Sequence, residues 1–421
     1  MHLVRPSEAA PRPWLAAASY WPAIEAATAH LDPPFGVVSL PALTANAFDM
    51  LDRANGTTIR VASKSVRVRG VLDAVLALPG YSGVLAYTLP EALWLATSSS
   101  AGAAIDDVVV GYPSVDRAAI RTLATSAELA SRVTIMVDDI AQLDLVDAVI
   151  APGDRESIRV CIELDASWDT RLLGHTGVRR SPVHTVAQAR ALAEAVVARP
   201  GFTLVGLMGY EAQIAGQANQ PAGRRAYGAV IRWMQRHSAA ELAERRAATV
   251  ASVREIAALD FVNGGGTGSL ESTSAEAAVT EIAAGSGLFG PHLFDNYRHF
   301  TPAPAVAFAL SVVRKPLPDH AVLLGGGWIA SGPPGPDRLP RVVWPEQTSM
   351  LAREMAGEVQ TPLTGPGAAD LRVGDRAWLR HTKAGEISEH LTEFAIVDGG
   401  ADEQAVVETL PTYRGQGQVF L

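Results

Sequence analysis

The stretch TTIRVASKS, residues 57–65, decides the fold of this chain. Its first six residues are rich in β-branched side chains and predict a strand, which runs into Lys64 between two serines. In a barrel of parallel strands, the carboxyl ends of the strands carry the chemistry. A lysine at that place can form a Schiff base when its amine is partly desolvated, because burial disfavours the ammonium form. The alternative is a strand-end lysine that reaches solvent.

Short apolar runs alternate with Ala-rich amphipathic segments from Gly36 to about residue 300. Each run is nearly continuously apolar, as expected for strands that are covered on both faces. Eight such strand–helix units in about 250 residues predict an α/β fold, a (β/α)8 TIM barrel. A doubly wound open sheet is the alternative. The eight expected strands are 57–63, 83–88, 107–112, 133–137, 160–165, 204–210, 261–264 and 279–284.

Helices are predicted before and between these strands. Residues 14–31 read as a helix that is interrupted near Pro22 and ended by Asp32-Pro33-Pro34. Spacing of apolar residues predicts the remaining helices. They are 43–54, 70–78, 116–130, 184–198, 224–237 and 240–257.

After Phe300 the sequence becomes Pro-rich and then β-branched, which predicts a second domain made mostly of strands. The expected domains are an N-terminal helical segment at 1–34 that packs on the β domain, a barrel at 35–300 and a β domain at 301–421. Strands are expected in the last domain at 321–324, 376–379, 394–397 and 405–410.

The chain has 421 residues, a net charge of −9 and a single cysteine, Cys161. No block of like charge stands out, which argues against nucleic acid as a partner. One cysteine leaves no internal disulfide and no Cys-rich zinc site. Because we find neither a signal peptide nor a window of about 18 uncharged apolar residues, we expect a cytoplasmic protein without a membrane partner.

Two glycine-rich turns follow the seventh and eighth expected strands, FVNGGGTGS at 261–269 and AGSGL at 284–288. The first has the spacing of neither a P-loop nor a dinucleotide fold. Glycines let the backbone approach a ligand and point N–H groups at it, which suits a phosphate; a flexible turn is the alternative. Barrels often bind phosphate after strands seven and eight. With Lys64, the turns therefore predict a phosphorylated aldehyde, pyridoxal 5'-phosphate (PLP).

These motifs resemble the alanine-racemase-like, fold-type III PLP-dependent enzymes, and within them the D-threonine aldolase and D-serine dehydratase branch. The similar segments are VVSLPALTANAFDMLDRA at 37–54, RVASKS at 60–65, GGGTGS at 264–269 and IAAGSGLFG at 282–290. The resemblance implies a barrel joined to a β domain, a homodimer, an amino-acid substrate and Lys64 as the Schiff-base lysine. It also implies that backbone groups hold the phosphate at Gly265, Gly266, Thr267, Gly285 and Ser286.

The sequence departs from the family pattern near the expected cofactor. His175 takes the place of an arginine that in the family reaches towards the PLP phenolate; the alternative is a surface histidine. Ala283 takes the place of the arginine that racemases put near the pyridine nitrogen, which favours bond cleavage over racemisation. Tyr210, at the end of the sixth expected strand, would meet the cofactor ring or else is a core tyrosine.

Another departure lies in RHTKAGE, residues 380–386. The branch has a His-x-Cys or His-x-Asp pair here that binds a divalent metal, whereas this chain has His381 and Lys383. An ammonium is no metal ligand, which argues against a bound metal. Either Lys383 replaces the metal and His381 is the general acid or base at the β-oxygen, or the chemistry no longer needs a metal. A solvated charged surface is the remaining alternative.

The combined prediction is a PLP-dependent lyase. Lys64 would bind the cofactor, and His381 with Lys383 would promote retro-aldol cleavage or dehydration of a β-hydroxy amino acid, of D configuration by resemblance. A PLP-dependent racemase or epimerase is the alternative, and it would need two acid/base groups on opposite faces of the cofactor plane. A non-catalytic PLP-binding protein is the third hypothesis.

Overall fold

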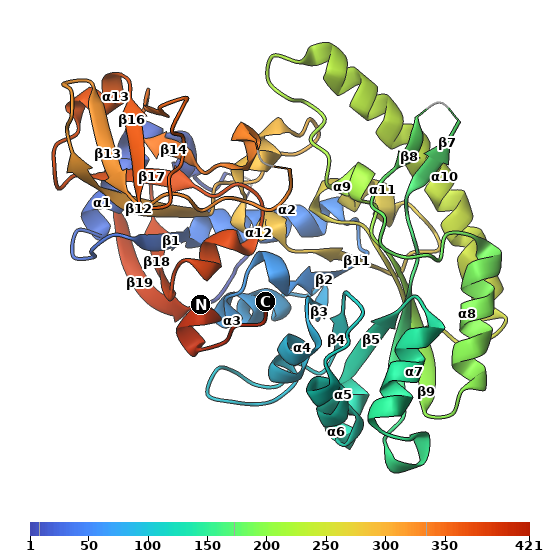
Figure 1. The fold of residues 1–421 in the computed structure, drawn as a ribbon. Helices are drawn as coiled ribbons and strands as arrows, with labels where there is room; N and C mark the ends of the chain where they lie inside the picture. The colour runs from blue at the N-terminus through green and yellow to red at the C-terminus, as the bar shows by residue number, and fades with distance from the viewer. Residues whose placement is uncertain (8, 172, 334) are drawn as a thin grey trace. The chain divides into compact units, whose positions relative to one another are not determined.

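Eight parallel strands close into a barrel in the order β10-β11-β2-β3-β4-β5-β6-β9 (Figure 1). This computed structural model describes residues 1–7, 9–171, 173–333 and 335–421. Each expected strand overlaps one barrel strand, so the predicted (β/α)8 barrel is confirmed and the open sheet is wrong. The barrel strands are β2 Thr58–Ala62, β3 Tyr81–Ala86, β4 Val108–Val110, β5 Val133–Val137, β6 Ile158–Glu163, β9 Phe202–Gly209, β10 Phe261–Gly264 and β11 Glu281–Ala284.

Closure of the barrel places strands that are far apart in the sequence beside each other. Strand β11 pairs in parallel with β2, with Ala284 opposite Val61, and it pairs on its other side with β10. The residues that follow β2, β10 and β11 therefore lie along one edge, the carboxyl end of the barrel. These residues are Lys64 and the two glycine-rich turns.

The chain divides into two compact units, which we call the barrel unit and the sheet unit. The barrel unit comprises Met50–Lys64, Leu76–Gly285 and Phe420–Leu421, and the sheet unit comprises Met1–Asp49, Ser65–Val75 and Ser286–Val419. The barrel unit also contains a hairpin of β7 Trp168–Thr170 and β8 Gly174–Thr176. Its helices are α4 Leu89–Leu95, α5 Arg117–Ala124, α6 Ala127–Arg132, α7 Ile140–Val149, α8 Val186–Ala198, α9 Ala212–Ala215, α10 Arg225–Arg254 and α11 Leu270–Ser274.

Two helix predictions for the barrel unit differ from the structure. The segment 116–130 forms two helices, α5 and α6, because the Ser126 side chain accepts a hydrogen bond from the Leu129 N–H and caps a new helix. The segments 224–237 and 240–257 form one helix, α10, because residues 237–240 contain neither Gly nor Pro. Among the helices of the described ranges, none has both the length and the apolar character needed to cross a membrane.

The sheet unit is built on a nine-stranded sheet with the path β15-β16-β13-β12-β1-β18-β19, in which β17 pairs with β12 and β14. The mostly-β second part that the sequence predicts is confirmed. Its strands are β1 Phe35–Ser39, β12 Val306–Arg314, β13 His320–Leu324, β14 Arg341–Trp344, β15 Ser349–Met350, β16 Gln360–Thr364, β17 Arg376–Arg380, β18 Glu393–Gly399 and β19 Gln404–Pro411. The other helices of the chain are α1 Ala17–Ala27, α2 Leu40–Arg53, α3 Arg69–Leu76, α12 Ser286–Phe289 and α13 Pro366–Asp370.

Strand β1 lies inside this sheet, antiparallel to β12 and parallel to β18. The sequence prediction places the same residues in the barrel. A buried five-residue apolar run followed by a helix has the same pattern in a barrel as in the sheet unit. The domain limits of 1–34, 35–300 and 301–421 stay a prediction.

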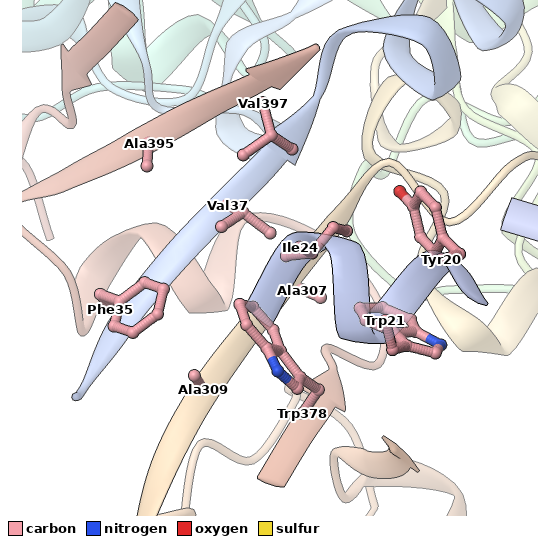
Figure 2. Close-up of a cluster of buried hydrophobic side chains, with 10 residues drawn as sticks. All are labelled: Tyr20, Trp21, Ile24, Phe35, Val37, Ala307, Ala309, Trp378, Ala395 and Val397. Atoms are coloured by element: carbon pink, nitrogen blue, oxygen red, sulfur yellow. The ribbon is translucent and has the colours of Figure 1, made fainter. Parts of the chain in front are cut away.

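Helix α1 packs against the sheet in an apolar cluster around Trp378 (Figure 2). The Trp378 ring is fully buried, and its centroid lies 5.8 Å from the ring of Trp21 and 5.5 Å from that of Phe35. Its Nε1 donates a hydrogen bond of 2.7 Å to Glu25. The helix runs through Pro22 without the predicted interruption, because burial of its neighbours compensates for the missing N–H.

Replacing Trp378 should therefore strongly destabilise the sheet unit. For Trp378→Ala we expect a loss of about 3–5 kcal/mol in the free energy of unfolding, measured by urea unfolding. Trp378→Phe keeps an aromatic ring and loses only the donor to Glu25, so it should cost about 1–3 kcal/mol. Equal losses in the two variants would contradict this account of the cluster.

Candidate active site

Lys64 stands directly after strand β2, in a short 3-10 turn of Ser63–Ser65. Its Nζ donates a hydrogen bond of 2.7 Å to the hydroxyl of Tyr112, which follows strand β4. The Ser63 hydroxyl donates to the carbonyl of Leu85 at 3.1 Å and ties the turn to the neighbouring strand. The structure thus places the amine at the carboxyl end of the barrel, beside a phenol.

The second glycine turn lies against the strand that carries Lys64. A Cβ added at Gly285 would stand 2.4 Å from the carbonyl oxygen of Ala62, two residues before the lysine. Any side chain there would clash with backbone, so only glycine allows this approach. Ser286, the next residue, begins helix α12.

The first glycine turn follows β10 and is equally close-packed. Gly265 has a φ of +77°, and an added Cβ would stand 2.6 Å from Ile282. At Gly266 a Cβ would stand 3.0 Å from Ala215 and 3.4 Å from the ring of Tyr210. Tyr210 therefore borders this turn, and Thr267, which follows, is buried. The Gly265 N–H donates to the Glu211 carboxylate at 2.9 Å, so Gly265 contributes its conformation to the turn.

An arginine that sequence reasoning missed lies among these aromatic rings. The Arg180 guanidinium carbon is 5.9 Å from the ring centroid of Tyr112 and 5.9 Å from that of Tyr210. Burial raises the pKa of Tyr210 to about 12, so its phenol stays neutral. The sequence feature that could have indicated this cation is the pair of adjacent arginines, Arg179 and Arg180, shortly after Gly177.

His175 lies on strand β8 of the hairpin, where its Nδ1 is 2.9 Å from a carboxylate oxygen of Asp169. Asp169 is its cross-strand partner in the hairpin. A contact with the cofactor phenolate stays a prediction for His175. The structure adds Arg180 as a cation in the same part of the chain.

Glu163, at the end of β6, is a further titratable group that the sequence did not single out. Burial, reinforced by the neighbouring Asp138, raises the pKa of Glu163 to about 7. A carboxyl that titrates near neutrality at this end of a barrel can exchange protons under working conditions.

Together these features fit PLP. An amine that can bind an aldehyde follows β2, and two close-packed glycine turns that can accept a phosphate follow the adjacent strands β10 and β11. Tyr210 and Arg180 supply an aromatic surface and a positive charge on the same unit.

Residues 38–292, more than half of the chain, match the family described as "Alanine racemase, N-terminal domain". The chain belongs to this family. Its similarity to the alanine-racemase-like, fold-type III group, expected from the sequence, is thereby confirmed.

Two relatives of this alanine racemase family member have curated names. D-threonine aldolase of Arthrobacter sp. is 26% identical over 316 residues, covering 71% of this chain and 72% of that protein. 3-Hydroxy-D-aspartate aldolase of Paracoccus denitrificans is 28% identical over 267 residues, covering 62% of this chain and 61% of that protein. The crystal structure of D-threonine aldolase from Filomicrobium marinum matches with a TM-score of 0.74 at 22% identity, over 93% of this chain and 97% of that one, which shows a shared fold.

In this family member, His381 follows strand β17 of the sheet unit and is 2% exposed. Within the described residues, neither ring nitrogen of His381 has a hydrogen-bond partner. Burial lowers the pKa of His381, so the ring is neutral at neutral pH and can accept a proton. The nearby Glu386 carboxylate accepts hydrogen bonds from the backbone N–H groups of Lys383 and Ala384, both at 2.7 Å, and fixes the loop that follows.

A divalent metal does not fit the residues found here. Lys383 donates from its Nζ to the carbonyl of Ser331 at 3.2 Å, and an ammonium has no lone pair to offer a cation. The carboxylate of Glu386 is occupied by backbone donors.

Proposed function

We propose that this protein is a PLP-dependent lyase that acts on a β-hydroxy D-amino acid, by retro-aldol cleavage or by dehydration. The observation that carries the proposal is the position of Lys64. It follows β2, and the glycine turn after the neighbouring strand β11 lies so close to Ala62 that an added Cβ at Gly285 would clash with its carbonyl oxygen. The family supports the cofactor, and the relatives named D-threonine aldolase and 3-hydroxy-D-aspartate aldolase support the substrate class.

Within the barrel unit, each side chain has a distinct task in this proposal. PLP, when bound, supplies an electron sink for the bonds at the substrate Cα. Lys64 would hold the cofactor through its amine and, in a dehydration, would carry the proton at Cα. The Tyr112 hydroxyl accepts a hydrogen bond from the amine and orients it. Arg180 holds negative charge near the ring, and the neutral Tyr210 packs beside the turn formed by Gly265 and Gly266.

We assign the proton at the β-oxygen to His381 and the accompanying positive charge to Lys383. Support comes from the sheet unit itself, where the buried His381 ring is neutral and has two nitrogens without partners within the described residues. A neutral imidazole can remove the hydroxyl proton in a retro-aldol cleavage, and the imidazolium formed when the ring has taken up a proton can protonate a leaving hydroxide. Lys383 takes the electrostatic part that a divalent metal would otherwise play.

We also propose that the enzyme works as a cytoplasmic homodimer, with Ser286 and Thr267 completing the phosphate site. The dimer is implied by the family resemblance, and the single buried cysteine suits a reducing compartment. Sedimentation velocity of the PLP-loaded protein measures the assembly, and a monomer would contradict it.

The test is a product assay on the D and L forms of threonine, serine and 3-hydroxyaspartate. We expect aldehyde or keto acid from at least one D isomer, little from its L isomer, and no loss of rate with a chelator, because Lys383 replaces the metal. Exchange of the Cα proton in deuterated water without such products would instead favour a racemase. No reaction with any of the amino acids would favour a non-catalytic PLP-binding protein.

A further inference from the structure

A buried carboxylate lies directly beneath the first glycine turn. Glu211 follows Tyr210 at the end of strand β9, and its side chain is 1% exposed. Its Oε2 accepts the Gly265 N–H at 2.9 Å, and its Oε1 accepts the hydroxyls of Thr273 at 2.6 Å and Ser269 at 3.3 Å. Three separate points of the segment 265–273 are thus attached to one side chain.

The charge of this carboxylate is balanced from helix α10. Arg246, also 1% exposed, donates from Nη2 to Glu211 at 3.0 Å and from Nη1 to Glu276 at 2.6 Å. The same Nη2 donates to the Gly209 carbonyl at 3.3 Å. An unbalanced buried carboxylate next to a phosphate site would repel the ligand and be costly to bury, and Arg246 removes both effects.

We propose that Glu211, held by Arg246, is a positioning residue that fixes the glycine turn in its phosphate-binding form before the cofactor arrives. This inference rests on the proposed PLP-dependent function. Glycines lose more backbone freedom on ordering than other residues, and three of them stand in a row at 264–266. The hydrogen bond at the Gly265 N–H orders the turn when the protein folds. Binding of the phosphate then loses no further backbone entropy in this turn.

The chain offers a matched control for this pair. Glu281, at the start of strand β11, is also a buried carboxylate paired with an arginine: it accepts from Arg60 Nε at 2.7 Å and from Asn263 at 2.8 Å. It lies at the opposite end of the strand from Gly285. Shortening either carboxylate to aspartate keeps its charge and changes only its reach.

The experiment compares the dissociation constants of PLP and of pyridoxal, which lacks the phosphate, for the full-length protein stripped of cofactor. We expect Glu211→Asp to lower the ratio of the pyridoxal constant to the PLP constant about tenfold, the effect of one weakened charge-assisted hydrogen bond. Glu281→Asp should leave the ratio at the wild-type value even where it lowers the melting temperature. If Glu211 served folding alone, Glu211→Asp would lower the melting temperature and leave the ratio unchanged. That result would overturn the proposal.

A second variant covers the case in which Glu211→Asp does not fold. Thr273→Val removes one of the anchoring hydroxyls, keeps the side-chain shape and should lower the same ratio by a smaller factor. An unchanged ratio in this variant would overturn the proposal. Failure of the wild-type protein to prefer PLP over pyridoxal would overturn the proposed function itself, which separates the two outcomes.

Discussion

Reduction of the PLP-loaded protein with borohydride is expected to attach the cofactor permanently to Lys64. The chain has only three lysines, Lys64, Lys315 and Lys383, so peptide mass mapping has three places to distinguish. Lys64 follows the barrel strand next to the second glycine turn. The Lys315 ammonium instead donates to the carbonyls of Pro318, Ala368 and Ala369.

The matching variant is Lys64→Ala. It should lose the absorbance band of lysine-bound cofactor, and kcat/KM should fall about 10³-fold or more, because the same amine binds the aldehyde and carries the proton. Lys315→Ala is the control and should keep both the band and the rate. Survival of the band in Lys64→Ala, or mapping of the cofactor to another lysine, would refute the assignment of the site.

Replacing His381 by alanine is expected to lower kcat about 10²–10⁴-fold while the cofactor spectrum stays as in the wild type. The expected loss is large because, in the proposed mechanism, the neutral ring takes the β-oxygen proton; its nitrogens have no partner within the described residues. His320→Ala, a change of the histidine that pairs with Asp319, is the control and should retain the rate. An unaltered rate in His381→Ala would remove this residue from the chemistry.

The pH dependence gives a further check on His381. An unperturbed histidine has a pKa near 6.5, and burial lowers the pKa of His381 from that value. The ring therefore remains neutral, and able to accept a proton, as the pH falls through 6.5. The pH at which kcat falls to half its maximum on the acid side should accordingly lie below 6.5. A midpoint at pH 6.5 that vanishes in His381→Ala would show that the ring is not desolvated during catalysis.

The barrel could be predicted because its strands are buried on both faces and therefore appear as separate apolar runs. The positions of Lys64 and Gly285 after barrel strands could be predicted because each stands at the end of such a run. Strand β1 could not be assigned to its sheet, because pairing with β12 and β18 depends on residues more than 250 positions away.

Side chains at the site were harder to foresee than the strands. Arg180 lies in an irregular segment after a hairpin, so no periodicity marks its direction. Glu211 is adjacent to Tyr210 in the sequence, but its partners at Gly265, Ser269 and Thr273 come from a turn that follows a different strand. Such long-range polar contacts follow from barrel closure and leave no local pattern.

The pairing of β11 with β2 has a consequence for biosynthesis. Gly285 is translated more than two hundred residues after Lys64, and the two come together only when the last barrel strand closes on the first. In the proposed function, a nascent chain on the ribosome therefore carries Lys64 long before PLP can be bound, and late closure of this kind is slow because it joins distant segments. Translation products that end before residue 281 would carry Lys64 without the second glycine turn, so under the proposed function PLP binding would report a completed barrel.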